Sequence, residues 1–88
     1  MKKKDFMNIL ELAKHNEIGI AVAISMPWLP SEEIIINPPE NVQEKIDYYQ
    51  QAYDDDMKLN MNENIRVIGA FGVEGEKFDF IYESLTNN

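Results

Sequence analysis

The stretch from residue 17 to residue 26 reads Glu17-Ile18-Gly19-Ile20-Ala21-Val22-Ala23-Ile24-Ser25-Met26. Bulky apolar side chains occupy every second position from Ile18 onward, and small side chains lie between them. A period of two with β-branched residues predicts a strand whose bulky face is buried in the core. Its other face, nearly bare of side chains, either allows a helix to approach closely or faces water.

A helix is expected before this strand, over roughly residues 5–15. Asp5 can serve as its N-cap by accepting hydrogen bonds from backbone N–H groups two and three residues further on. After Asp5, apolar residues recur at the helical spacing i, i+3, i+4 and i+7, so one face of the helix contains Phe6, Ile9, Leu10 and Ala13. Asn16 is the expected end of the helix.

After the strand, Pro27 and Pro30 bracket a loop that contains Trp28, because proline cannot donate to a central β-ladder. A second strand from Glu33 to Ile36 completes a wide hairpin. A second helix is predicted over roughly residues 39–53. Asn37 is its expected cap, and an apolar stripe runs along it through Val42, Ile46, Tyr49 and Tyr53.

The last third of the chain is predicted to be extended. Leu59 and Met61 alternate with polar residues in a short segment, and a strand is expected from Ile65 to Val73. Glu74-Gly75-Glu76 is a turn signal, and Phe78, Phe80 and Tyr82 then alternate with polar residues as in a half-buried strand. The expected apolar face of the strand before the turn contains Ile65, Val67, Phe71 and Val73, with Gly69 between them.

These elements predict an α+β fold in the order αββαββ. Short connections favour a four-stranded, mainly antiparallel sheet with two helices on one face. The length of 88 residues suits a single domain over residues 1–88. A domain of this size has a modest core, so a homodimer remains an open alternative.

The charge balance of the chain is strongly acidic. Sixteen acidic residues against eight basic ones give a net charge of −8, which argues against direct binding of nucleic acid. The excess is concentrated in residues 31–56, which contain eight acidic side chains and one basic side chain.

The sequence contains no cysteine, which favours a reducing compartment. Met1-Lys2-Lys3-Lys4 resembles the start of a signal peptide, but Asp5, Asn8 and Glu11 interrupt the apolar run that such a peptide needs. No stretch approaches the length of a transmembrane helix. We therefore expect a cytoplasmic protein without a membrane anchor.

Nothing in the chain suggests catalysis, a cofactor or a metal. His15 is the only histidine, at a helix end where a cation is favoured, and no cysteine nucleophile exists. Asp54, Asp55 and Asp56 are consecutive and lack the alternating ligands and glycine of a calcium loop. Gly69, Gly72 and Gly75 do not form a phosphate loop. We expect a protein that is not an enzyme and that requires neither a cofactor nor a metal.

The candidate site is instead a partner-binding surface. The acidic candidates are Glu40, Glu44, Asp47, Asp54, Asp55 and Asp56, on the side of the second helix opposite its apolar stripe or just after the helix. The simpler reading of these residues is a solvated face that only confers solubility. Trp28 is a further candidate, because exposed aromatics anchor interfaces. The alternative is that its ring folds back on the hairpin and closes the core.

One part of the chain resembles a known group of proteins. It comprises Glu33-Ile34-Ile35-Ile36-Asn37-Pro38-Pro39-Glu40-Asn41, then Lys45-Ile46-Asp47-Tyr48-Tyr49-Gln50-Gln51-Ala52-Tyr53-Asp54-Asp55-Asp56, then Ile65-Arg66-Val67-Ile68-Gly69-Ala70-Phe71. This part resembles small uncharacterised proteins encoded by phages and prophages of Gram-positive bacteria. The resemblance covers residues 33–71. It implies a phage or prophage origin but no biochemical mechanism.

Two functions are expected on these grounds. The first is a phage accessory protein, of the anti-CRISPR or anti-defence kind, that acts in the bacterial host cytoplasm. Its carboxylates would replace phosphates on a host protein with a basic, nucleic-acid-binding surface, since complementary charge speeds encounter. The second is a non-enzymatic structural or assembly module that forms a homo-oligomer.

Overall fold

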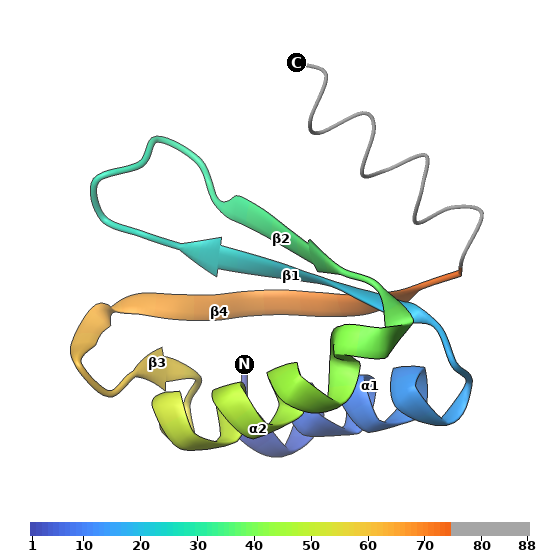
Figure 1. Ribbon diagram of the computed structural model, residues 1–88. Coiled ribbons are helices and arrows are strands. Elements are labelled where there is room, and N and C mark those ends of the chain that lie inside the picture. The colour runs from blue at the N-terminus through green and yellow to red at the C-terminus, as the bar shows by residue number, and fades with distance from the viewer. Residues whose placement is uncertain (75–88) are drawn as a thin grey trace.

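The computed structural model describes residues 1–74 and confirms an α+β fold in the order αββαββ (Figure 1). The two strands after the second helix differ from those expected, because a short strand precedes the long one. The strand predicted at Phe78–Tyr82 lies outside the described residues. The elements are α1 (Lys3–His15), β1 (Gly19–Ser25), β2 (Glu33–Asn37), the 3-10 turn η1 (Pro39–Asn41), α2 (Val42–Ala52), β3 (Lys58–Leu59) and β4 (Asn62–Val73).

The four strands form one antiparallel sheet in the order β2-β1-β4-β3. β1, the strand with alternating bulky and small apolar residues, lies in the middle of this sheet, which explains its continuous apolar character. Both helices lie on the same side of the sheet (Figure 1). The opposite side, here called the outer face of the sheet, is turned away from α1 and α2.

The core lies between the sheet and the two helices. β1 contributes its bulky face, and α1 and α2 contribute the apolar stripes expected from their spacing. The rings of Phe6 and Tyr49 join the helices in an edge-to-face contact with centroids 4.9 Å apart. The buried members are Phe6, Leu10 and Ala13 of α1, Ile20, Val22 and Ile24 of β1, and Val42, Ile46, Tyr49 and Tyr53 in and directly after α2. The predicted rotation of α2 is therefore confirmed.

The start of each helix differs from the sequence prediction. α1 begins at Lys3 with Lys2 at the N-cap, so Asp5 lies within the first turn and caps nothing. Its charge there still suits the positive end of the helix dipole. Asn37 is likewise not a cap, because it ends β2 and is buried, and a 3-10 turn separates it from α2. A cap residue and a residue just before a helix carry the same sequence signal, and tertiary packing decides between them.

A β-bulge in β4 overturns the predicted alignment of its apolar side chains. Ala21 pairs with Phe71 and Ile24 pairs with Val67, so three steps along β1 match four steps along β4. The extra residue reverses which face the following side chains occupy. Val67 faces the helices and is buried, whereas Phe71 lies on the outer face and is 52 % exposed. The prediction that Ile65, Val67, Phe71 and Val73 share one face is therefore wrong.

Among residues 1–74, neither helix is long and apolar enough to cross a membrane.

Candidate partner-binding surface

The outer side of α2 carries three of the predicted acidic residues. Glu40 lies in η1, Glu44 and Asp47 lie in α2, and all three are exposed. The buried stripe on the other side of the helix fixes this orientation, because residues half a turn apart point in opposite directions. Asp47 accepts a hydrogen bond of 3.0 Å from Nε2 of Gln43, one turn earlier. We call Glu40, Glu44 and Asp47 the helix acids.

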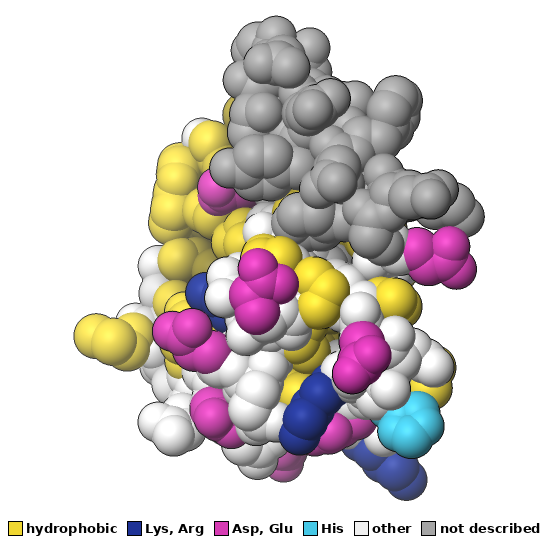
Figure 2. All heavy atoms as spheres, turned by 45° about the vertical axis from the view of Figure 1, so that its right-hand side comes forward, with side chains coloured by type: hydrophobic (Ala, Val, Ile, Leu, Met, Phe, Trp, Pro, Cys, Tyr) yellow, Lys and Arg dark blue, Asp and Glu magenta, His cyan; other side chains and the backbone are white. Residues whose placement is uncertain are grey.

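In Figure 2 the acidic side chains of the visible surface lie in separate groups, with backbone, uncharged side chains or basic side chains between them. They do not merge there into a single negative patch.

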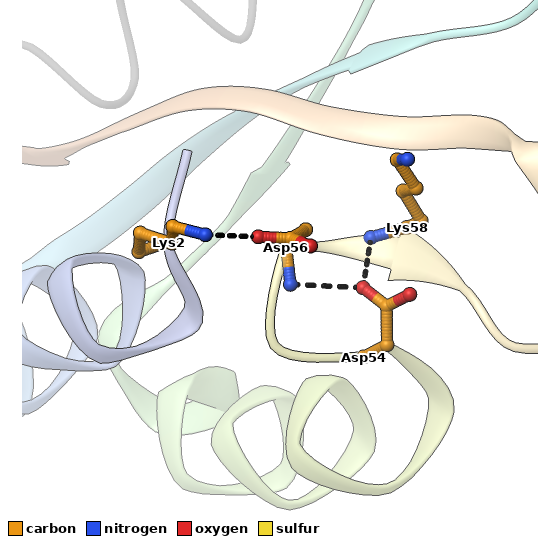
Figure 3. A network of polar contacts seen from close by, with 4 residues as sticks. All are labelled: Lys2, Asp54, Asp56 and Lys58. Carbon is orange, nitrogen blue, oxygen red and sulfur yellow. Dashed lines mark hydrogen bonds and ion pairs between the residues drawn. The ribbon is translucent and has the colours of Figure 1, made fainter.

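Asp54 has a structural role that the sequence did not reveal. Its Oδ1 accepts hydrogen bonds of 2.9 Å from the backbone N–H groups of Asp56 and Lys58 (Figure 3). These bonds close the turn that places Met57 in the left-handed region, with φ of 59°. A methionine in this conformation is uncommon, and its fully buried side chain helps to hold it there. The Asp54 carboxylate thus already binds the chain's own backbone.

Asp56 also has a partner within the chain. Its carboxylate forms an ion pair with Nζ of Lys2, 54 residues earlier in the sequence (Figure 3). The hydrogen bond and the charge of Lys2 hold the pKa of the Asp56 carboxyl below its usual value. The same contact raises the pKa of the Lys2 ammonium. Both side chains are exposed, so this pair contributes little to stability.

The N-terminal lysines gather around the end of α2. Nζ of Lys3 donates hydrogen bonds of 2.6 Å to the carbonyl oxygens of Gln50 and Tyr53. A cation at this position satisfies the last carbonyls of the helix and opposes the negative end of its dipole. The N–H of Lys3 also donates to the carbonyl of Asp55, at 2.8 Å. The helix end is thus stabilised by a segment about 50 residues away, which the local sequence could not indicate.

Asp55 lies in the same basic surroundings. It lines a shallow hollow together with Asp5 and the three lysines Lys2, Lys3 and Lys4. We call Asp54, Asp55 and Asp56 the loop acids. The loop acids are exposed, as expected, but they lie beside lysines and backbone donors instead of continuing the acidic surface of α2.

Trp28 is 61 % exposed in the loop between β1 and β2. The alternative in which its ring folds back to close the core is therefore wrong. Leu29, next to it, is also an exposed apolar residue. An exposed aromatic ring beside a second apolar side chain is suited to anchor a partner.

Burial changes the acidity of the two tyrosines in the core, Tyr49 and Tyr53. Burial raises the pKa of Tyr53 to about 12, and the neighbouring Tyr48 adds to the effect. Burial also raises the pKa of Tyr49 well above its usual value. Both hydroxyls stay protonated in neutral solution, so Tyr49 and Tyr53 act as core residues.

His15 is exposed at the last position of α1. Within residues 1–74, no group of three or more His, Cys, Asp or Glu side chains is placed to hold a metal ion.

Comparison of the chain with protein-family models gave no match. Neither a search of curated proteins nor a search of solved structures returned a similar protein. The resemblance of residues 33–71 to phage and prophage proteins thus stays an expectation from the sequence.

Proposed function

We propose that this chain is a small acidic accessory protein of phage type that binds and inhibits a host protein. The target would be a nucleic-acid-binding or defence protein with a basic surface, so the activity would resemble that of anti-CRISPR and other anti-defence proteins. The place of action would be the bacterial host cytoplasm. In this proposal the chain is not an enzyme and uses no cofactor.

The observation that carries the proposal is that the helix acids are exposed and form no ion pair within residues 1–74. Glu40 is exposed in η1, Glu44 and Asp47 are exposed in α2, and the one ion pair among residues 1–74 joins Lys2 to Asp56 elsewhere. Carboxylates that form no ion pair within residues 1–74 can meet a partner's Lys and Arg side chains. On a helix they keep a fixed spacing, which lets them replace a row of phosphates.

The loop acids enter the proposal in a reduced role. Asp54 holds its own turn and Asp56 holds Lys2, so neither is a free phosphate mimic. Trp28 supplies the apolar part of the proposed interface, since an aromatic anchor gives affinity that charge alone does not.

The experiment begins with capture of host proteins on the immobilised chain. Capture is then repeated with Glu40→Gln, Glu44→Gln and Asp47→Asn combined. Loss of a specific partner with this variant supports the proposal. A partner captured equally well by both proteins contradicts phosphate mimicry by α2.

A second candidate function is a structural or assembly module that forms a homo-oligomer. It is favoured by apolar side chains that remain exposed, among them Trp28 and Phe71. Size-exclusion chromatography with light scattering separates the two candidates. A dimer that dissociates on Trp28→Ala or Phe71→Ser supports assembly, and a monomer at high concentration opposes it.

A further inference from the structure

Three polar side chains line up across the outer face of the sheet. Ile24 faces the helices, so the next residue of β1, Ser25, faces outward. Ser25 pairs with Arg66 of β4, and Arg66 pairs with Lys58 of β3. Paired residues in an antiparallel sheet share a face, so these three side chains lie side by side. Figure 3 shows the Lys58 side chain extending away from α2, as this register requires.

The two cations in this row face one another directly. Side chains opposite each other in an antiparallel pair have Cβ atoms about 5 Å apart, and like charges at that distance destabilise the pair. Among residues 1–74, no carboxylate comes within ion-pair distance of Lys58 or Arg66. Asp56, two residues before Lys58, pairs with Lys2 instead. Two cations side by side, neither with an ion-pair partner among residues 1–74, are unexpected in a chain with twice as many acidic as basic residues.

The cations border a groove of about 460 Å³. Ser25 and Asn64 bring a hydroxyl and an amide to its lining, Pro27 at the start of the β1–β2 loop adds an apolar residue, and Glu63 also lies in the lining. A guanidinium, an ammonium, a hydroxyl and an amide are all hydrogen-bond donors. The groove thus combines two positive charges and two neutral donors with one carboxylate, so its lining carries a net positive charge.

We propose that this groove binds an oxyanion of the phosphate class, either free phosphate or the end of a small phosphate monoester. Arg66 offers a planar fork that matches two oxygens of such an anion, and Lys58 offers a second, compact charge. The anion relieves the repulsion between the two cations, which a neutral ligand cannot do. This site is separate from the helix acids and does not depend on the function proposed for them.

The overall charge of −8 sets the expected strength of binding. Long-range repulsion opposes the approach of any anion, so only short contacts within the groove can hold it. We therefore expect a dissociation constant of about 1 mM for free phosphate.

The test is a titration of the folded chain followed by nuclear magnetic resonance of the backbone amides, at constant ionic strength. Separate arms use inorganic phosphate, O-phosphoserine and chloride. We expect saturable shifts at Ser25, Lys58 and Arg66 with both phosphate ligands and none with chloride. Tighter binding of O-phosphoserine assigns the site to a phosphate monoester, and equal or tighter binding of inorganic phosphate assigns it to the free ion.

Substitutions complete the test. Arg66→Gln and Lys58→Gln each remove one charge from the groove and should weaken phosphate binding about tenfold. Lys14→Gln removes one charge from the exposed surface of α1 and should change nothing. The amide spectra show directly whether each variant is folded. Shifts that rise linearly without saturation, or a midpoint that Arg66→Gln leaves unchanged, would overturn the proposal.

Discussion

The helix acids and the loop acids are close in sequence but differ in what surrounds them. Glu44 and Asp47 extend from a regular helix whose other side is buried, and no cation pairs with them in the described part of the chain. Asp54 and Asp56 lie in a tight turn, where one binds backbone N–H groups and the other binds Lys2. The helix acids and the loop acids thus carry the same formal charge, but the helix acids are more available to a partner.

The difference has a physical cause. A regular helix satisfies its own interior backbone groups, so acids on its outer side have no backbone donor to bind. A tight turn leaves N–H groups free, and an aspartate at its start satisfies them. The end of α2 also attracts cations through its dipole, which brings the N-terminal lysines to the loop acids.

The largest effect on stability is expected from a change in the buried stripe of α2, because this stripe fixes the rotation of the helix. Ile46→Asp places a charge on the buried stripe that turns the helix acids outward. An unpaired buried charge costs several kcal/mol, which approaches the whole stability of a small domain. We expect loss of cooperative unfolding and of the native circular dichroism spectrum. A variant that keeps both would show that the helix faces another way.

The next largest effect on stability is expected at Asp54, and it should distinguish Asp54 from its neighbour Asp55. Asp54→Ala leaves two N–H groups in the turn without their acceptor and should lower the free energy of unfolding by about 1–2 kcal/mol. Asp55→Ala, its neighbour, makes no such bonds and serves as the matched control with a change below about 0.5 kcal/mol. Urea unfolding monitored by far-ultraviolet circular dichroism measures both. An equal loss in the free energy of unfolding for both variants would contradict the structural role of Asp54.

A smaller effect concerns the Lys2–Asp56 pair. The pKa of Asp56 is lowered in the folded chain, so the pair stabilises the fold above the unfolded pKa of the carboxyl and loses this contribution as the pH falls through the folded pKa. The raised pKa of Lys2 means that the contribution is lost again in strong alkali, as the pH rises through a value above 10.5. Between these limits the pair is intact.

Carbon-13 titration of the Asp56 carboxyl measures this coupling. Lys2→Gln should raise the titration midpoint of Asp56, and Lys14→Gln, far along α1, should leave it unchanged. The same midpoint in wild type and Lys2→Gln would mean that the ion pair does not form in solution.

The smallest effect is expected for the helix acids. Combined Glu40→Gln, Glu44→Gln and Asp47→Asn substitutions should change the free energy of unfolding by less than about 1 kcal/mol, because these side chains are exposed and bear no cationic partner. Reduced like-charge repulsion between positions 40 and 44 acts in the stabilising direction. Thermal unfolding would reveal a structural role as a clear loss.

Periodic elements were predictable from the sequence, whereas long-range contacts were not. The apolar stripes of α1 and α2 gave the rotation of each helix, because the helical repeat is fixed by the backbone. The bulge beside Val67 and the contact of Lys3 with Gln50 arise from segments far apart in the chain. No local pattern encodes them, so the faces of β4 and the partners of the loop acids appeared only in the structure.

The central claim is that the helix acids bind the partner, and affinity at two salt concentrations tests it most directly. The matched control is Glu11→Gln, Glu17→Gln and Glu74→Gln, which are exposed residues outside η1, α2 and the loop that contains Trp28. Each triple variant raises the net charge from −8 by three. We predict that the helix-acid variant weakens binding to the captured partner and flattens its salt dependence, while the control retains most of both. Equal affinities of the two variants at both salt concentrations would contradict the claim.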